Sequence, residues 1–311
     1  MKIAIIGRSE LLYNTASHLI ELGYEIPLII TAKEAPEYKI TSEDYREFAE
    51  KIGAKFIKTA RINRKEIIEQ IKFLGTIDIA VSINFSGIIA EEVINLFPLG
   101  ILNAHGGDLP RYRGNACQAW AILNKEEKIG LCIHQMIGGE LDSGDILSRK
   151  YLPINIDTRI GEVYDWMYQT IPLLMVDAIE ELSINSIFFL EKQSKDPKDT
   201  LRTYPRNPSD GKIDWKSSNE DIIRLINASS EPFSGAFCNY EGEKLIIWRA
   251  FIYEDTEIYY AAQGQVASIN KTDKYIVVIT GLGKIKITEI EYKGERTVPT
   301  DVIKSIRKRL R

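Results

Sequence analysis

Residues 77–83 read Ile-Asp-Ile-Ala-Val-Ser-Ile, an apolar run with the length of one β-strand. Successive side chains of a strand point to opposite faces, so a run that is apolar on both faces is typical of a strand buried between two layers. Lys2 to Ile6 is a second such run, and the segment Leu11 to Leu22 that follows it has helical spacing. Strands of this kind, joined by helices, predict an α/β fold with a parallel sheet.

The same alternation continues along the first half of the chain. Further strands are predicted at Glu25 to Thr31, at Ala54 to Ile57 and in a run that ends near Leu102, and further helices at Ser42 to Ile52 and Arg64 to Phe73. The prediction is therefore an open, mostly parallel sheet. Ligands bind beyond the carboxyl ends of the strands in such sheets. Site residues are expected in the turns after Ile6, Thr31, Ile83 and Leu102.

The composition changes after Leu190. Residues 191–197, Glu-Lys-Gln-Ser-Lys-Asp-Pro, are polar and have no hydrophobic period. We therefore predict a first domain over 1–190, a linker over 191–215 and a second domain over 216–311. The second domain is predicted to hold a helix at Asn219 to Ser229 and strands at Lys244 to Ala250, Gly264 to Ile269, Tyr275 to Thr280 and Lys284 to Glu289. Such a series of strands is typical of a small barrel or sandwich.

Composition and charge exclude several classes of protein. The 40 basic and 44 acidic side chains give a net charge of −4, which argues against a broad face for binding nucleic acid. No run approaches the roughly 18 apolar residues of a membrane span, and the N-terminus lacks the pattern of a secretory leader, so a cytoplasmic location is expected. The three cysteines, Cys117, Cys132 and Cys238, show no CxxC spacing, which favours buried thiols over a disulfide framework or a metal site.

Gly7-Arg8-Ser9 follows the first predicted strand, where some α/β proteins bind a dinucleotide. The segment lacks the second and third glycines of the GxGxxG pattern, so it does not predict a dinucleotide site. We interpret it as a tight turn between strand and helix that faces the ligand cleft.

The most informative stretch runs from Gly100 to Leu147. An apolar strand ends there in Asn103-Ala104-His105, and the two-residue period of a strand places Asn103 and His105 on one face. Asp142 lies in a later Gly-flanked turn, from which a carboxylate can orient the imidazole. An amide, an imidazole and a carboxylate are the groups that acyl transfer to an amine requires. Each of them alone would be read as a cap, turn or core residue.

Three segments carry a resemblance to a known family: Asn-Ala-His at 103–105, Leu-Pro-Arg-Tyr-Arg-Gly at 109–114 and Leu-Asp-Ser-Gly-Asp-Ile at 141–146. They resemble the formyltransferases that use 10-formyltetrahydrofolate, a family that includes methionyl-tRNA formyltransferase and the sugar N-formyltransferases. The likeness continues more loosely into 206–215 and 232–237. It implies a Rossmann-like domain followed by an OB-like barrel, with the folate as co-substrate and no metal.

The resemblance also implies roles for individual residues. The catalytic asparagine, histidine and aspartate of the family fall on Asn103, His105 and Asp142. Asn103 would donate to the oxyanion that develops when a substrate amine attacks the formyl carbon. A neutral His105, oriented by Asp142, would relay the amine proton to the folate nitrogen. The folate would lie against two loops, and its binding residues would be Phe85, Ser86, Gly87, Ile88, Gly139, Leu141 and Asp145.

The acceptor of the formyl group is suggested by charge. In the family that this sequence resembles, the enzyme that acts on methionyl-tRNA carries a basic insertion after the second strand. The corresponding segment here, Ala32 to Lys51, has four basic and six acidic residues, a net charge of −2, which would repel phosphates. Asp108 and Asn115 add polar groups that suit a hydroxylated ligand. We therefore predict an amino sugar linked to a dTDP, UDP or GDP nucleotide as acceptor.

Such an acceptor needs a cation for its diphosphate and an aromatic ring for its base. The candidate substrate-binding residues are Arg8, Ser9, Asp108, Arg111, Asn115, Tyr204 and Arg206. His134 lies on a predicted strand, Leu131 to Ile137, where it is either a structural histidine or part of the cleft. The sugar, its aminated carbon and the base are left open.

Other readings remain at this point. Five of the residues in 304–311 are basic, and we interpret this segment as the end of a solvated helix that begins near Asp301, with RNA contact as the alternative. Methionyl-tRNA formyltransferase is the alternative function, and a formyltetrahydrofolate-binding protein or hydrolase is the second alternative. The resemblance and the strand edges of the second domain predict a homodimer.

Overall fold

The computed structural model describes residues 1–36, 38–185 and 190–311. These form two compact units that are interleaved along the chain. The first comprises Met1–Cys117, Ile129–Leu152 and Tyr164–Tyr204, and the second comprises Gln118–Lys128, Pro153–Val163 and Pro205–Arg311. The domain boundaries drawn from composition stay predictions. Glu37, one of the acidic residues counted above, lies outside the described residues.

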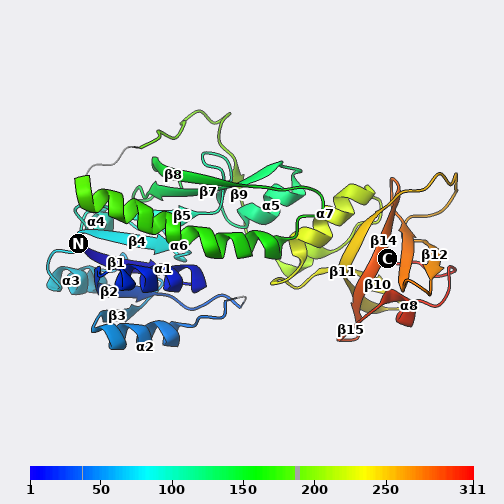
Figure 1. Cartoon of the computed structure of the whole chain (residues 1–311), viewed down its shortest axis with the longest axis horizontal. Helices are drawn as coiled ribbons and strands as arrows, with labels where there is room; N and C mark the ends of the chain where they lie inside the picture. The colour runs from blue at the N-terminus through cyan, green and yellow to red at the C-terminus, as the bar shows by residue number, and fades with distance from the viewer. Residues whose placement is uncertain (37, 186–189) are drawn as a thin grey trace. The chain divides into compact units, whose positions relative to one another are not determined.

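A seven-stranded sheet forms the centre of the first unit (Figure 1). Its strands, in the order in which they lie side by side, are β3 (Lys55–Lys58), β2 (Glu25–Thr31), β1 (Lys2–Gly7), β4 (Ile79–Ile83), β5 (Ile101–His105), β7 (Lys128–Gln135) and β8 (Ile146–Pro153). The neighbours from β3 to β5 pair in parallel, and β7 pairs antiparallel to β5. The mostly parallel sheet predicted from the sequence is confirmed.

The sequence of the first half of the chain also marks where helices begin and end. The helices of the first half are α1 (Glu10–Glu21), α2 (Ser42–Ile52), α3 (Lys65–Phe73), α4 (Glu91–Ile94), α5 (Cys117–Leu123) and α6 (Ile160–Asn185). At the start of α2, Thr41 and Asp44 form a reciprocal capping box, and Gly53 ends the helix in the left-handed conformation. Among the described helices, none is long and apolar enough to cross a membrane.

The strand order reverses between β1 and β4, which is where ligands of such sheets bind. The turn after β1 is tight because Gly7 has a φ of +144°, and a Cβ there would lie 2.0 Å from the carbonyl oxygen of Ile83. Ser9 follows at a φ of +84°, and the Tyr45 hydroxyl donates to its carbonyl oxygen over 2.8 Å. Main-chain geometry that only glycine tolerates therefore brings this turn against the end of β4.

A second, antiparallel sheet forms the second unit. It comprises β10 (Ala236–Tyr240), β11 (Glu243–Tyr253), β14 (Lys284–Tyr292), β13 (Tyr275–Ile279) and β12 (Val266–Asn270) in this order, with β15 (Glu295–Thr297) beside β14. The helix α7 (Asn219–Ser229) packs on β11 and matches its predicted bounds. A short pair, β6 (Arg113–Gly114) and β9 (Arg202–Thr203), belongs to the first unit, and η1 (Pro208–Gly211) lies before α7.

The prediction of a helix running from near Asp301 to the C-terminus is wrong. The helix α8 covers only Pro299–Val302, and the segment after it contains a turn at 306–307 and no helix. Leu310 is buried in the core of the second unit, and the tail bonds to both outer strands, through Asn239 of β10 and Val266 of β12. Packing and strand pairing within the second unit therefore determine the conformation of this segment. These edges, on which the sequence placed a dimer, are partly paired within the chain, and the homodimer stays a prediction.

Candidate active site

Asn103 and His105 lie at the carboxyl end of β5, where the two-residue period put them on one face. The antiparallel neighbour β7 places His134 directly opposite Asn103, and Cys132 opposite His105. Two histidines and an asparagine therefore meet at the point where the sheet changes from parallel to antiparallel pairing. Their rings come close, since the centroids of His105 and His134 are 6.2 Å apart.

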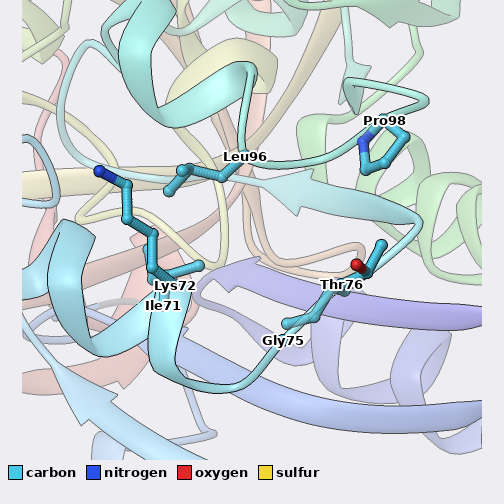
Figure 2. A pocket seen from close by; sticks show the side chains of 7 residues that line it. Ile71, Lys72, Gly75, Thr76, Leu96 and Pro98 are labelled. Atoms are coloured by element: carbon cyan, nitrogen blue, oxygen red, sulfur yellow. The ribbon is translucent and has the colours of Figure 1, made fainter.

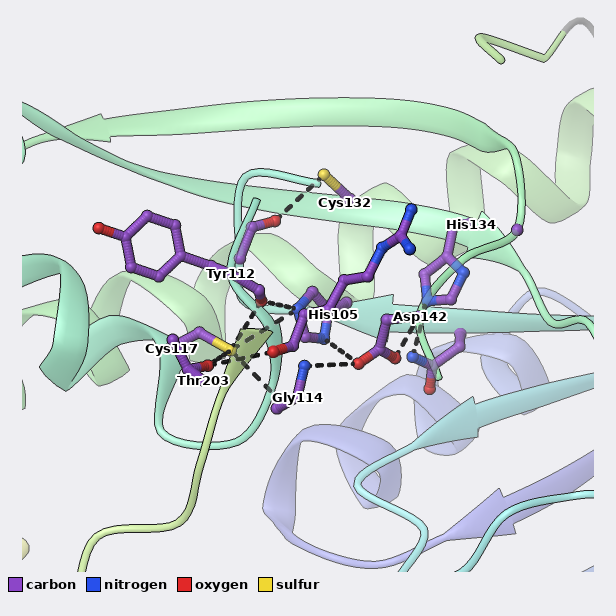
Figure 3. Close-up of polar contacts among 12 residues, drawn as sticks. His105, Tyr112, Gly114, Cys117, Cys132, His134, Asp142 and Thr203 are labelled. Atoms are coloured by element: carbon purple, nitrogen blue, oxygen red, sulfur yellow. Dashed lines mark hydrogen bonds and ion pairs between the residues drawn. The ribbon is translucent and has the colours of Figure 1, made fainter. Parts of the chain in front are cut away.

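The carboxylate of Asp142 lies between the two imidazoles (Figure 3). Its Oδ2 is 3.5 Å from Nδ1 of His105, and its Oδ1 is 3.7 Å from Nε2 of His134. The side chain of Asp142 is only 12% exposed, so water screens these charges weakly. The structure thus brings together the three residues that the sequence singled out, and it adds His134 to them.

His105 is held as an imidazolium, which corrects the expectation of a neutral ring. Its Nε2 lies 2.6 Å from the carbonyl oxygen of Tyr112, which only accepts, so Nε2 carries a proton. Its Nδ1 faces the Asp142 carboxylate, which favours a second proton there. Burial works against this charge, but the Asp142 carboxylate, assisted by Cys117 and by the Tyr112 carbonyl, raises the pKa of His105 to about 10.

His134 takes the opposite protonation state. Its Nδ1 donates to the carbonyl oxygen of Gln135 over 2.8 Å, and its Nε2 lies 3.0 Å from Nδ2 of Asn103. An amide nitrogen only donates, so Nε2 accepts and the ring is neutral. Burial lowers the pKa of His134 to about 4, against the pull of Asp142. The ring thereby fixes the Asn103 amide, whose second N–H is left for another acceptor.

The main chain around Asp142 is unusual. Asp142 has a φ of +48°, a left-handed conformation that a residue with a side chain rarely adopts. The Gly114 N–H donates to Oδ2 of Asp142 over 2.9 Å, and a Cβ at Gly144 would lie 1.8 Å from the carbonyl oxygen of Gln135. This loop is therefore fitted tightly against β6 and β7.

Sequence reasoning missed several groups at this site. Cys117, read there as a small buried apolar residue, is buried, but its Sγ lies 3.0 Å from the Tyr112 carbonyl oxygen and 3.6 Å from Nε2 of His105. Gln193 lies in the stretch read as a polar linker, yet it is 7% exposed and bonds to the Asp142 loop. Neither residue has a local pattern that announces such a contact.

The two loops expected to hold folate touch each other. The N–H of Gly139 donates to the carbonyl oxygen of Ile89 over 3.1 Å, which joins the loop after β4 to the loop before β8. Asn63 supports the first loop, because its amide bonds to main-chain atoms of Ile88 and Ala90 over 2.8 Å each. The side chain of Ile88 is 55% exposed on this loop.

The other residues expected at the folate site differ in their surroundings. Phe85 packs against the sheet's core, Ser86 is exposed and Gly87 approaches Ala60 closely enough that a Cβ would lie 3.1 Å from its carbonyl oxygen. Leu141 is partly buried. The Asp145 carboxylate pairs with Lys192 and accepts from the Gln193 N–H.

Arg8 and Ser9 lie at the strand-order reversal. The Arg8 guanidinium donates to the carbonyl oxygens of Asn84, over 3.0 Å, and Lys33, over 2.8 Å, and lies 5.7 Å from the ring centroid of Tyr38. Ser9 is 1% exposed, and its hydroxyl contacts Asn84, so its side chain faces the fold rather than solvent.

Asp108 is engaged by other side chains. Arg149 lies 2.9 Å from its carboxylate, and the hydroxyl of Tyr151 donates to the same oxygen over 3.0 Å. On the following loop, Arg111 is exposed with its guanidinium 5.7 Å from the ring centroid of Tyr112, and Asn115 is exposed. The polar groups predicted after His105 are thus present, with Asp108 already in an ion pair.

Tyr204 and Arg206 belong to different compact units. Tyr204 is 60% exposed and stacks with Arg202, whose guanidinium is 4.9 Å from the ring centroid. Arg206 donates to the carbonyl oxygen of Ala228 over 3.1 Å and to the hydroxyl of Ser229, at the end of α7. A cation there complements the negative C-terminal end of the helix.

A surface pocket of about 320 Å³ lies away from these groups (Figure 2). Its lining comes from the end of α3 and from the turns that precede β4 and β5, namely Ile71, Lys72, Gly75, Thr76, Ile77, Leu96 and Pro98. It lies at the amino ends of the parallel strands, opposite the edge that holds His105. In the part of the chain that the structure describes, no group of three or more potential metal ligands is found.

Comparison with known proteins finds relatives along almost the whole chain. The chain is 29% identical over 301 residues to a methionyl-tRNA formyltransferase of Ruminiclostridium cellulolyticum, which covers 95% of this chain and 93% of the relative. It is also 29% identical over 300 residues to a methionyl-tRNA formyltransferase of Halothermothrix orenii, with coverage of 94% and 90%.

Solved structures with this fold include sugar enzymes. WlaRD, a sugar 3N-formyltransferase solved with dTDP and 5-N-formyl-THF, superposes with a TM-score of 0.67 at 19% identity, over 95% of this chain and 98% of that one. The N-formyltransferase of Helicobacter canadensis, solved with folinic acid and dTDP-3-aminofucose, gives 0.66 at 19% identity, over 92% and 98%. These likenesses show the fold.

Family models match both halves of the chain. The model described as formyl transferase matches residues 1–179, and the model described as formyl transferase, C-terminal domain, matches residues 206–306. The first match spans more than half of the chain and contains Asn103, His105 and Asp142. This protein belongs to the formyl transferase family.

Proposed function

We propose that this enzyme transfers the formyl group of 10-formyltetrahydrofolate to the amine of a nucleotide-linked amino sugar. Formyl transfer follows from the family, and Asn103, His105 and Asp142 are the residues that we assign to it. The nature of the acceptor rests on the charge of the segment that leads into α2.

The arrangement of the three groups suits acyl transfer to an amine. One N–H of Asn103 is taken by His134, so the other is free to donate to the oxygen of the formyl group as negative charge develops there. The His105 imidazolium adds a positive charge beside the same atom. Asp142 stabilises that imidazolium and keeps the ring oriented.

The proton balance follows from the protonated state of His105. The amine attacks the formyl carbon. As the carbon–nitrogen bond breaks, His105 gives its Nε2 proton, which it donates to the Tyr112 carbonyl oxygen before the reaction, to the folate nitrogen, and Nε2 then takes a proton from the newly bound amine. The amine loses one hydrogen, the folate nitrogen gains one, and His105 ends as it began. This is the relay expected from the sequence, begun from the imidazolium instead of the neutral ring.

The loops proposed to hold folate fit a flat, partly apolar ligand. Ile88 offers an exposed apolar side chain, Gly139 has no atom within 4 Å of where a Cβ would be, and the N–H of Gly139 already ties the two loops together. A ligand wedged there would reach Asn103, which lies on the strand beside β4. Phe85, Ser86, Gly87, Leu141 and Asp145 complete the proposed site.

The observation that carries the acceptor proposal is the acidic balance of residues 32–51, which hold six acidic and four basic side chains. The pKa of Glu34 is lowered by hydrogen bonds from its own and Ser42's main-chain N–H groups, and the pKa of Asp44 is lowered by hydrogen bonds from Thr41. Carboxylates are charged at neutral pH in any case, and these hydrogen bonds fix where two of the charges lie. Glu10 likewise accepts from the main chain of Lys39 and Ile40. Built into the loop in this way, the carboxylates disfavour a polyanion.

Methionyl-tRNA is the second candidate acceptor, and a specific observation favours it. The relatives that are 29% identical over almost the whole chain are methionyl-tRNA formyltransferases, whereas the sugar enzymes are similar at 19% identity. The basic tail, of which Arg307 and Arg309 are exposed, is a further argument for this acceptor.

The test offers both acceptors to the same enzyme. Purified protein and 10-formyltetrahydrofolate are incubated with dTDP-, UDP- and GDP-linked amino sugars, with methionyl initiator tRNA, and without an amine, and the formylated product and formate are measured. We expect turnover with one nucleotide sugar. Turnover confined to the tRNA would overturn the acceptor proposal, and release of formate without an amine would indicate a hydrolase.

A further inference from the structure

The side-chain amide nitrogen of Gln193 donates to two carbonyl oxygens of the loop that carries Asp142. Its Nε2 lies 3.0 Å from the carbonyl oxygen of Asp142 and 2.6 Å from that of Gly144. The side chain is 7% exposed, and its own N–H approaches the Asp145 carboxylate at 3.3 Å. The buried side-chain amide therefore contacts two carbonyl oxygens of this loop, and the main-chain N–H of Gln193 contacts a third residue, Asp145.

The other end of the same amide reaches β6. Arg113 Nη2 donates to Oε1 of Gln193 over 2.7 Å, and the next residue, Gly114, donates its N–H to the Asp142 carboxylate. The main chain of β6 also pairs with β9, between Gly114 and Thr203. Gln193 thus connects the loop that carries Asp142 with the strand that binds the Asp142 carboxylate.

This connection matters because the conformation of Asp142 is costly. A residue with a side chain at a φ of +48° typically loses stability and persists only where its surroundings enforce the geometry. The carbonyl oxygens of Asp142 and Gly144 would each lose their bond to Gln193 if the loop relaxed. Relaxation would also carry the carboxylate away from Nδ1 of His105, at present 3.5 Å away.

We propose that Gln193 is a positioning residue that holds the Asp142 carboxylate between His105 and His134, and through it sets the protonation of His105. This rests on the proposed role of Asp142 and His105 in formyl transfer. Gln193 acts without touching the reacting atoms. The proposal gives the start of the segment 191–215, which the sequence alone presented as a linker, a role in positioning Asp142.

Four parts of the fold contribute groups that face His105. Asp142 lies on the loop before β8, Cys117 begins α5, the Tyr112 carbonyl belongs to the loop after β5, and His134 lies on β7. Asp142 supplies the only carboxylate paired with His105 among the described residues. Its displacement would therefore lower the pKa of His105, because burial then acts unopposed by an opposite charge.

The test reads the histidines directly. The chain has three of them, His18, His105 and His134, so the imidazole signals of a ¹⁵N-histidine-labelled sample can be assigned with three single variants. In Gln193→Met, which keeps the volume and removes the hydrogen bonds, the pKa of His105 should fall by about one unit or more. No substrate is needed, so this result is independent of whether the proposed acceptor is correct.

Gln265→Met is the matched control. Its Nε2 also bonds main-chain carbonyl oxygens, including that of Lys308 at 3.0 Å, but these lie in the second unit. It should leave the titration of His105 and the turnover unchanged. Gln193→Asn, whose amide is one methylene too short to span both partners, supplies a second test if Gln193→Met does not fold.

The second readout is the rate of formyl transfer by the same variants, compared with the wild type. Displacing Asp142 should lower kcat by about 10–100-fold, since small errors in the placement of reacting groups have effects of this size. The alkaline limb of the pH–rate profile should move down together with the pKa of His105. A folded Gln193 variant that titrates and turns over like the wild type would overturn the proposal while leaving the proposed function intact.

Discussion

Nε2 of His134 accepts a hydrogen bond from the Asn103 amide over 3.0 Å, across the antiparallel pair of β5 and β7. The acceptor state of Nε2 is enforced by the bond from Nδ1 to the Gln135 carbonyl oxygen. Because an amide can turn about its last side-chain bond, the neutral ring decides which way the N–H groups of Asn103 point. The orientation of the group that faces the formyl oxygen is thus set by a histidine on the neighbouring strand.

We expect His134→Leu to lower kcat about tenfold, because an unpaired buried donor costs about 1–3 kcal/mol and Asn103 would turn to find another acceptor. His134→Gln offers an amide oxygen in place of Nε2 and should retain more activity than the leucine variant. The measurement is kcat at saturating folate and acceptor, with His18→Leu as control, since His18 is exposed on α1. Equal rates for His134→Leu and the wild type would contradict this role.

Asn103→Ala should reduce turnover by about 10²–10³-fold, the usual effect of removing a donor to a developing oxyanion. Asn103→Asp keeps the shape of the side chain but removes both N–H donors, so it should lose as much. Single-turnover rates of formyl transfer measure this, and Asn14→Ala, at an exposed position of α1, is the control. If Asn103→Ala retains full turnover, the assignment of Asn103 is wrong.

The sequence predicts the frame of the site well because the frame follows local periods. Asn103 and His105 share a face through the two-residue period of β5, and the alternation of apolar runs and helices predicts the parallel sheet. The meeting of these residues with Asp142 follows from the family resemblance. Nothing local to residue 142 points to a carboxylate between two imidazoles.

Contacts between distant segments are where prediction from the sequence fails. The protonation of His105 depends on the carbonyl oxygen of Tyr112, which lies within hydrogen-bond distance of Nε2. Asp108 forms an ion pair with Arg149 of β8. The charged C-terminal segment looks like a solvated helix end, yet Leu310 is 1% exposed and anchors it in the second unit. Burial of one apolar side chain and pairing to two strands outweigh the local charge pattern there.

The two buried histidines should give the protein a stability maximum near pH 6.5. The pKa of His105 is raised to about 10 by the Asp142 carboxylate despite burial, so the folded state binds a proton that the unfolded state releases above pH 6.5. Stability from His105 is therefore complete below pH 6.5 and is lost as the pH rises toward 10. The slope approaches about 1.4 kcal/mol per pH unit for one proton.

His134 acts on the acidic side. Burial lowers its pKa to about 4, so the unfolded state takes up a proton below pH 6.5 that the folded state resists. Stability from His134 is then lost as the pH falls from 6.5 toward 4. Urea unfolding at pH 5, 6.5 and 8.5, compared with His105→Gln and His134→Gln, checks both slopes. A wild-type stability that is flat over this range would contradict the two assigned protonation states.

The turn after β1 gives a prediction about the fold. Gly7→Ala should lower the free energy of unfolding by about 3 kcal/mol, because the added Cβ meets the Ile83 carbonyl oxygen at 2.0 Å and the φ of +144° is itself unfavourable. Gly23→Ala is the matched control, since Gly23 has a φ of +86° but nothing within 4 Å of its Cβ position. Gly23→Ala should lower the free energy of unfolding by only about 1 kcal/mol, from backbone strain alone. Equilibrium urea unfolding of both variants separates the clash from the strain, and equal losses would mean that β1 and β4 can move apart at no cost.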